Sequence, residues 1–314
     1  MSAVASALVA LVHGAFGSWY AFGSGTLVRS TPLFLTGLSV AIAFRAGVLN
    51  IGAEGQFLIG AATATAVGLH LGGAPAGVAL PIILTAGAIG GALWAGIAAL
   101  LRARFHVLEV ISTILLNFIA ADLVSYLVRG PLQEPLHIYP QTASLSPSAQ
   151  LPRFGAQTRL HLGFVIAVGA CIAAWWIIKF TAAGFRLRAV GANPAAAAMA
   201  GQIDVGKATT RVFLVSGALA GVAGAIEVSG VTYALYENLS PGYGYTAIAV
   251  ALMGQLHPAG VLGAGLFFGA LEAGATAMQR DAGVPSVVGA VIQAAIIVVF
   301  LVVARVRAGG RPAS

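Results

Sequence analysis

The chain has 314 residues, of which 59% are hydrophobic and only 8% are charged. Soluble domains carry about 25% charged residues, so this composition excludes a soluble globular protein and indicates an integral membrane protein. The net charge of +7 does not indicate nucleic-acid binding, because Lys and Arg gather at the ends of apolar segments. The single cysteine, Cys171, excludes an intramolecular disulfide and a CxxC metal or redox site.

The apolar segments predict an all-α membrane protein with about ten transmembrane helices. We expect spans at residues 3–22, 31–45, 56–72, 78–101, 108–128, 160–180, 209–233, 245–257, 259–278 and 285–304. No basic residue precedes the first apolar segment, which we therefore interpret as a span and not as a cleaved signal peptide. With both termini in the cytoplasm, eleven of the sixteen Lys and Arg residues lie inside, which favours this orientation.

A polar, glycine-rich segment at residues 47–56 separates apolar runs at 32–44 and 57–71. Each run reaches about 20 Å as a helix, whereas the hydrocarbon core of a bilayer is about 30 Å thick. The polar segment is therefore expected at membrane depth, where irregular backbone is tolerated only inside protein or beside a cavity. This pattern predicts a translocation pathway.

The second half of the chain contains a faint repeat of this arrangement. The run FLVSGAL at residues 213–219 is similar to FLTGL at 34–38, and a second Gly-rich interruption follows it at 240–245. In the expected topology the two opening helices run in opposite directions, as an inverted repeat requires. Paired interruptions in two halves point to a central transport site.

Two loops stand out between the expected spans. Residues 129–159 are rich in Pro, Ser and Gln and are expected outside the membrane, and residues 181–208 form the largest cytoplasmic loop. Within the second loop, Asn193 suits an N-cap, Pro194 the first helical position and Gly201 the end of a short helix. Such a helix either docks in a groove of another protein or connects two parts of its own chain, and the spacing does not decide between them.

Acidic residues inside spans are candidates for function, because a charge at the bilayer centre costs about 2.5–3.5 kcal/mol on insertion scales. Glu54 is the strongest candidate, since it shares the broken segment with Asn50 and Gln56. A role in holding the break together explains it equally well. Asp122 and Glu227 lie deep in spans, where structural hydrogen bonding is at least as good an explanation as contact with a substrate.

Two further acidic residues have weaker claims. Glu109 lies near Arg102 and Arg104 at a cytoplasmic end, which predicts an interfacial partner, whereas the position of Glu272 leaves its role open.

Other polar residues offer hydrogen bonds or an aromatic surface. Thr113 and Asn117 share one helix face, which suits either interhelical bonding or a ligand. Tyr243 and Tyr245 flank the second interruption as interfacial residues or as a stacking surface for a planar ligand. The sequence contains no P-loop, zincin or GxSxG motif, so another subunit or an ion gradient must supply any energy.

Four segments resemble hallmarks of one transporter family. They are GVLNIGAEGQ at 47–56, EVISTILLN at 109–117, RAVGANP at 188–194 and SPGYGYTAIAVAL at 240–252. They are similar to those of nucleoside and simple-sugar permease subunits of bacterial ABC importers, which share a superfamily with the ribose and branched-chain amino-acid permeases. The resemblance covers most of residues 32–300. The alanines at 195–198 depart from it, since relatives often carry a charged residue there.

The resemblance implies a single transmembrane domain over residues 1–314, with broken helices, an inverted repeat and a type II importer-like fold in the bacterial inner membrane. A paralogous permease would complete the pore, ATP-binding subunits would dock on the 181–208 loop, and an extracytoplasmic lipoprotein would deliver nucleoside. ATP and Mg would bind to the partner, and this chain would carry no cofactor, metal or catalytic residue.

Combined with the polar pattern, the resemblance implies two groups of functional residues. The expected substrate pathway comprises Asn50, Glu54, Gln56, Thr113, Asn117, Glu227, Tyr243 and Tyr245. The expected coupling surface comprises Gly191, Asn193, Pro194, Ala195, Ala197, Met199 and Gly201.

Three alternatives remain open at this point. The cargo would be a pentose or another sugar if the pathway is more polar. An ion-coupled secondary transporter would use Glu54, Glu227 or Glu272 as its coupling carboxylate. A membrane-embedded enzyme is disfavoured, because no nucleophile–base or metal constellation is visible.

Overall fold

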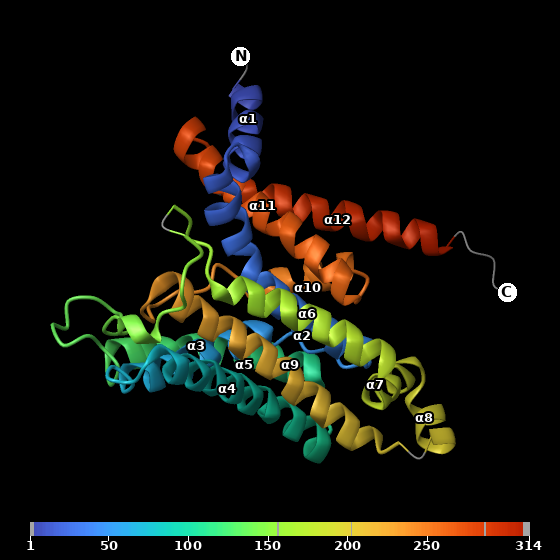
Figure 1. Ribbon diagram of the computed structural model, residues 1–314. Coiled ribbons are helices and arrows are strands. Elements are labelled where there is room, and N and C mark those ends of the chain that lie inside the picture. Colours follow the sequence, from blue (N-terminus) through green and yellow to red (C-terminus); the bar gives the residue numbers. More distant parts are fainter. Residues whose placement is uncertain (1–2, 156, 202, 286, 310–314) are drawn as a thin grey trace. The chain divides into compact units, whose positions relative to one another are not determined.

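The computed structural model describes residues 3–155, 157–201, 203–285 and 287–309, and it is almost entirely helical in these ranges (Figure 1). Their β structure is limited to two isolated bridges, Gln141–Tyr236 and Arg153–His161. The α-helices are α1 (Ala3–Phe16), α2 (Val28–Arg45), α3 (Ala53–Leu69), α4 (Ala76–Phe105), α5 (Glu109–Arg129), α6 (Leu162–Phe180), α7 (Ala182–Ala192), α8 (Pro194–Gly201), α9 (Val205–Glu227), α10 (Tyr243–Met253), α11 (Pro258–Ala282) and α12 (Val287–Gly309). Two π-helical segments, η1 (Ala21–Leu27) and η3 (Val228–Thr232), and a 3₁₀ turn, η2 (Pro147–Ala149), complete the order.

Six helical stretches in the described residues are long and apolar enough to cross a membrane, which makes the protein multi-pass. These stretches are Ala21–Arg45, Ala76–Phe105, Glu109–Arg129, Leu162–Phe180, Val205–Thr232 and Pro258–Ala282. α3 and α10 are shorter, with 17 and 11 residues.

The expectation of a half-length helix before the first break is wrong. The π-helix η1 runs directly into α2, so Ala21–Arg45 forms 25 continuous helical residues. The apolar run before the break begins only at residue 32, but the polar residues that precede it are helical as well, and the Ser30 hydroxyl donates to the carbonyl of Thr26 at 2.8 Å. Back-bonding of this kind satisfies a hydroxyl within a helix and removes the need for a boundary.

The chain forms two compact units, one of residues Thr31–Gly265 and the other of Met1–Ser30 with Leu266–Ser314. In the smaller unit, the Thr26 hydroxyl donates to the carbonyl of Ala15 at 2.9 Å. Arg29 and Glu272 lie 3.6 Å apart as an ion pair, which gives Glu272 a charged partner within this unit.

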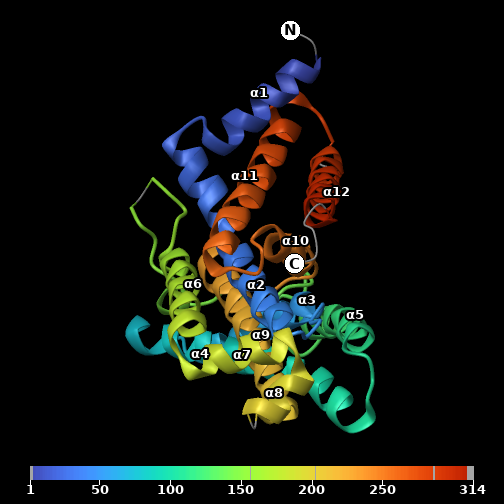
Figure 2. The ribbon, with the colours of Figure 1, turned by 90° about the vertical axis from the view of Figure 1, so that its right-hand side faces the viewer.

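The larger unit is built around the close packing of α3, α4 and α9 (Figure 2). Gly87 and Gly91 of α4 face Gly217 and Gly221 of α9, and a Cβ at Gly221 would lie 2.1 Å from the carbonyl oxygen of Gly87. Small residues four apart let helix backbones approach closely in a membrane, where packing replaces the hydrophobic effect between helices. The glycines therefore set the helix spacing on which the functional site is built.

The loop at residues 130–161 packs against the segment that follows α9. Backbone N–H groups of Thr142 and Leu145 donate to the carbonyls of Leu235 and Tyr233, at 2.9 and 2.7 Å. Leu145 and Leu151 are buried at 2% exposure each. This loop thus contributes to the core of the larger unit.

Candidate functional site

The first break occupies residues 46–52, between the end of α2 and the start of α3, and is shorter than the predicted segment 47–56 because Ala53–Gln56 already form the first turn of α3. Asn50 is fully buried at its centre. Its side-chain amide donates to Gln56 Oε1 at 3.0 Å and to Ser216 Oγ at 2.8 Å, and its Oδ1 accepts from the backbone N–H of Gly52 at 2.9 Å. Asn50 thus replaces the backbone bonds that the interrupted helix lacks.

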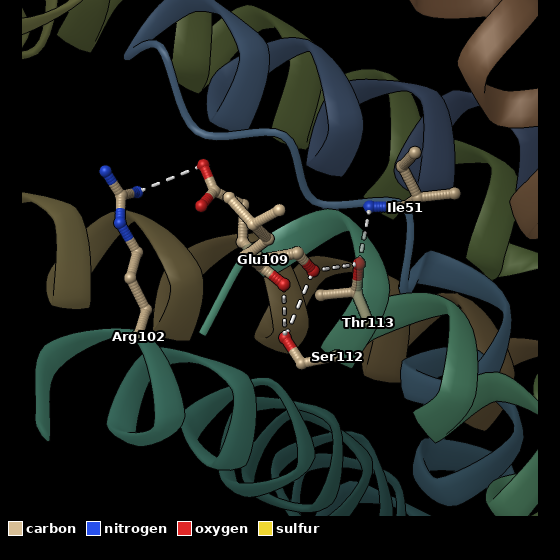
Figure 3. A network of polar contacts seen from close by, with 6 residues as sticks. Ile51, Arg102, Glu109, Ser112 and Thr113 are labelled. Carbon is tan, nitrogen blue, oxygen red and sulfur yellow. Dashed lines mark hydrogen bonds and ion pairs between the residues drawn. The ribbon is translucent and has the colours of Figure 1, made fainter. Parts of the chain in front are cut away.

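α5 braces the same break from the other side (Figure 3). The backbone N–H of Ile51 donates to Thr113 Oγ1 at 3.3 Å, and the Asn117 amide donates to the carbonyl of Ile51 at 3.0 Å. Asn117 Oδ1 also accepts from the N–H of Gly55 at 2.8 Å. The predicted shared face of Thr113 and Asn117 is confirmed, and these hydrogen bonds stabilise the irregular backbone.

The predicted partnership of Glu109 is also confirmed. Glu109 Oε1 lies 3.3 Å from Arg102 Nη1, which joins the start of α5 to the end of α4 (Figure 3). The contact is an ion pair without hydrogen-bond geometry, because the same Arg102 nitrogen has no hydrogen-bond partner among the described residues. Glu109 therefore belongs to a helix-end contact.

The two interruptions meet at the N-termini of α3 and α10. Glu54, in the first turn of α3, accepts a hydrogen bond from the backbone N–H of Gly244 through its Oε2 at 2.7 Å. A Cβ at Gly244 would lie 2.1 Å from the backbone nitrogen of Glu54, so only glycine allows this approach. Helix N-termini carry partial positive charge, and the Glu54 carboxylate compensates both ends at their junction.

A cavity of about 390 Å³ lies beside this junction. Its walls come from the start of α3, the middle of α5, the segment at 237–240 and the first turn of α10. The polar lining residues are Glu54, Asn117, Asp122, Ser125, Glu237, Asn238 and Ser240, and Phe118 and Tyr245 supply aromatic surface. Ligand pockets of about 300–1,000 Å³ typically accept small molecules, so this cavity has room for one.

An ion pair between Arg129 and Glu237, supported by Ser125 and called the latch below, lies at one wall of the cavity. Arg129 at the end of α5 donates to both carboxylate oxygens of Glu237, at 2.6 and 2.7 Å, and the Ser125 hydroxyl donates to the same carboxylate. These hydrogen bonds, with the charge of Arg129, lower the pKa of Glu237 to about 2. The sequence reasoning missed this latch, although an acidic residue three positions before the second interruption was the available signal.

The structure separates the predicted pathway residues into two groups. Glu54, Asn117 and Tyr245 line the cavity, and Tyr245 is 45% exposed. Asn50, Gln56 and Thr113 stabilise the first break, and Tyr243 packs on Phe57 with ring centroids 5.8 Å apart. Glu227 is buried at the end of α9. Asp122, Ser125 and Ser240 line the cavity although they stood outside the predicted set.

The predicted cytoplasmic helix forms as α8, and its predicted cap is confirmed. Asn193 Oδ1 accepts from the backbone N–H of Ala196 at 3.0 Å, and Pro194 opens the helix. Just before it, a Cβ at Gly191 of α7 would lie 2.0 Å from the carbonyl oxygen of Arg45. The loop that carries α8 therefore rests on the chain where α2 ends and the first break begins.

The residues of α8 differ in their access to a partner. Met199 is 81% exposed and Ala195 is exposed, whereas Ala197 is only 6% exposed and faces its own chain. The expectation that Ala197 lies on a docking surface therefore does not fit its burial. The accessible residues of the helix are Pro194, Ala195, Ala196, Ala198 and Met199.

The two breaks and the contact between the N-termini of α3 and α10 are typical of a membrane transporter, and the sequence has no P-loop motif. A family described as the permease component of the branched-chain amino acid transport system matches residues 23–301, and the chain belongs to this family. No solved structure matches the chain.

Three curated relatives cover most of the chain. The guanosine ABC transporter permease protein NupP of Bacillus subtilis is 43% identical over 303 residues, 95% of this chain and 85% of NupP. The glucose ABC transporter permease protein TsgB13 of Haloferax volcanii is 39% identical over 286 residues, 88% of this chain and 74% of TsgB13. The nucleoside ABC transporter permease protein NupB of Lactococcus lactis is 33% identical over 296 residues, 91% of this chain and 80% of NupB.

Proposed function

We propose that the chain is the permease subunit of a bacterial ABC importer and forms half of the translocation pathway for nucleosides. The observation that carries this function is the Glu54–Gly244 contact, which joins the N-termini of two short helices beside a cavity. Half-helices that meet inside a membrane are a recurrent way to build transport sites. Two of the three relatives reported above are named for nucleosides or guanosine, which supports this cargo.

The proposed architecture is one transmembrane domain over residues 1–314 with ten spans and an inverted repeat. The domain lies in the inner membrane with both termini in the cytoplasm, and the loop at 129–159 lies outside. α3 and α10 are counted among the ten spans as helices that enter the membrane from the two breaks.

Substrate passes along the cavity in this proposal, with Glu54, Asn117 and Tyr245 as pathway residues. Carboxylate and amide oxygens accept hydrogen bonds from ribose hydroxyls and base N–H groups, and Tyr245 offers an exposed ring for stacking. The other predicted pathway residues do not line the cavity and support it structurally in this proposal: Asn50, Gln56, Thr113, Glu227 and Tyr243. Two of the three carboxylates in the lining already have partners, since Glu237 is paired with Arg129 and Glu54 accepts from the Gly244 N–H, and the aromatic surface suits a planar base.

A paralogous permease completes the pore, an ATP-binding subunit docks on α8, and a lipoprotein delivers cargo to the outer face. ATP and Mg bind to the partner subunit. Movement of α8 is transmitted through Gly191 of α7 to the carbonyl of Arg45 at the start of the first break. The backbone shape of this coupling segment depends on Gly191, Asn193, Pro194 and Gly201. The contact with the partner is made by Ala195 and Met199, and the buried Ala197 packs the helix against its own chain.

The test is uptake by proteoliposomes that contain this permease, its paralogue, the ATP-binding subunit and the binding lipoprotein. We expect guanosine or another nucleoside to accumulate only with ATP at the cytoplasmic face, and unlabelled nucleoside to compete better than glucose or ribose. Preferential uptake of glucose would favour the sugar alternative, which the glucose-named relative keeps open. Uptake driven by an ion gradient without the ATP-binding subunit would overturn the ABC mechanism.

A further inference from the structure

A second cavity, of about 510 Å³, lies between α2, α6, α7 and α9, away from the Glu54 junction. Small residues of α6 and α7 leave this space open, among them Ala170, Ala173, Ala174 and Ala183. Larger aliphatic side chains of α2 and α9 form the opposite wall, including Leu38, Ile42 and Leu219. Apart from two arginines, every residue that lines the cavity is apolar.

The two arginines are Arg186 of α7 and Arg211 of α9. Both side chains belong to exposed residues, and within the described residues neither forms an ion pair or a hydrogen bond. Two cationic groups at the rim of an apolar cavity match a ligand with an anionic head and a hydrocarbon tail.

Neighbouring residues place this rim at a membrane–water interface. Trp175 and Trp176 near the end of α6 are exposed, and the Lys179 ammonium lies 5.4 Å from the Trp175 ring. Exposed Trp beside Lys at a helix end is typical of the headgroup level of a bilayer. α7 follows α6 directly (Figure 1), and Arg186 is the fifth residue of α7, close in sequence to this belt.

A smaller basic pocket adjoins the cavity at the same end. It has a volume of about 210 Å³, shares Ile178 with the apolar cavity, and is lined by Arg45, Lys179, Arg188 and His257. Basic pockets between transmembrane helices bind the phosphates of anionic lipids. The positive charge around the mouth therefore extends beyond the two rim arginines.

We propose that this cavity is a binding site for an anionic phospholipid. An acyl chain fills the space between α6 and α9, and the headgroup phosphate lies between Arg186 and Arg211. Because α7 carries the loop that ends in α8, the lipid packs behind the segment that contacts the first break. The proposal is independent of the cargo that the permease carries.

Native mass spectrometry of the full chain tests the proposal after equilibration with equal amounts of phosphatidylglycerol and phosphatidylcholine. We expect retention of phosphatidylglycerol in preference to phosphatidylcholine. The double variant Arg186→Gln with Arg211→Gln is expected to reduce this preference roughly 30-fold, the effect of two basic residues at a membrane surface. The matched control Arg104→Gln removes an exposed arginine that does not line the cavity, and it retains the preference.

A cavity-filling variant makes the test independent of charge. Ala173 is exposed towards the cavity, so Ala173→Trp is expected to abolish lipid retention while the chain remains folded. Equal retention of both lipids by the unaltered chain, or no effect of either variant, would overturn the proposal. So would displacement by millimolar inorganic phosphate. Loss of the bound lipid on assembly with a partner subunit would assign the cavity to that subunit instead.

Discussion

The two breaks in the larger unit are built differently. The first break is surrounded by buried amide and hydroxyl groups from α3, α5 and α9, with Asn50 bonded to Gln56 and Ser216. The second break is held by polar groups that are half-buried or exposed: Ser240 Oγ accepts from the N–H groups of Gly242 and Tyr243, Arg129 and Ser125 donate to Glu237, and the segment lines a cavity. This contrast indicates that the first break is a rigid frame and that the second provides the adaptable wall.

The largest effect is expected from Asn50→Ala. The change removes the hydrogen-bond partner of the buried Gln56 side chain and of the Gly52 N–H, whereas Ser216 keeps its bonds to Ser39, and each unsatisfied buried group costs about 1–3 kcal/mol. We expect a loss of several kcal/mol and little recoverable protein, measured as detergent-extracted yield and thermal midpoint. This result would assign Asn50 to folding more than to substrate contact.

Asn238→Ala is the counterpart in the second break. Asn238 is exposed beside the cavity, with φ of 55°, so the cost is about 1 kcal/mol of left-handed backbone strain. Equal destabilisation by the two variants would contradict the difference between the breaks.

The next effect is expected from Gly244→Ala, which acts where the two breaks meet. The new methyl would lie 2.1 Å from the Glu54 nitrogen, and its three nearest contacts are all backbone atoms, so the helices must separate. Overpacking of this kind costs about 1–3 kcal/mol. We expect uptake to be lost at a thermal midpoint several degrees lower.

Gly263→Ala is the control for helical glycines in the same unit, because a Cβ at this position meets open space. It should match or exceed the stability of the unaltered chain, since alanine favours the helix. Normal uptake by Gly244→Ala would show that the junction tolerates separation, and it would remove the argument for a shared site.

A smaller effect is expected from Glu54→Gln. The neutral amide keeps the shape of the side chain but replaces a charge-assisted hydrogen bond to the Gly244 N–H, which is worth roughly 1 kcal/mol more than a neutral one. We expect uptake to fall about tenfold with a stability change near 1 kcal/mol. Asp122→Asn changes another cavity carboxylate that lies outside the junction. An equal or larger loss for Asp122→Asn would place substrate recognition on α5 and not at the junction.

The sequence predicts the positions of the two breaks and of α8, because glycines, prolines and capping residues act locally. It also predicts the Arg102–Glu109 pair, whose members are close in sequence. It does not predict that Asn50 bonds to Ser216, since 166 residues separate them and an amide in a break suits either a brace or a ligand contact. The continuous helix Ala21–Arg45 was missed because hydroxyl back-bonding hides polar residues inside a helix.

The smallest effect is expected at the latch of the second break, and it depends on pH. Arg129 and Ser125 hold the pKa of Glu237 at about 2, below the usual value of 4.5. The folded state therefore favours the charged carboxylate, and the stabilisation is present above about pH 4.5 and is lost as the pH falls towards 2. Exposed ion pairs contribute little, and the Arg129 side chain is 63% exposed, so the effect is small at any pH.

Glu237→Gln should therefore lower the thermal midpoint by a small, constant amount between pH 5 and 8. The gap between the variant and the unaltered chain should narrow as the pH falls below about 4.5 and close near pH 2. Arg129→Gln should give the same profile, because it removes the other half of the same pair. A gap of constant size from pH 5 down to pH 2 would show that Glu237 acts by packing and not by charge. A large difference in thermal midpoint at neutral pH would show instead that the second break is as firmly held as the first. The Arg129–Glu237 ion pair would then stabilise the second break as strongly as the Asn50 hydrogen bonds stabilise the first.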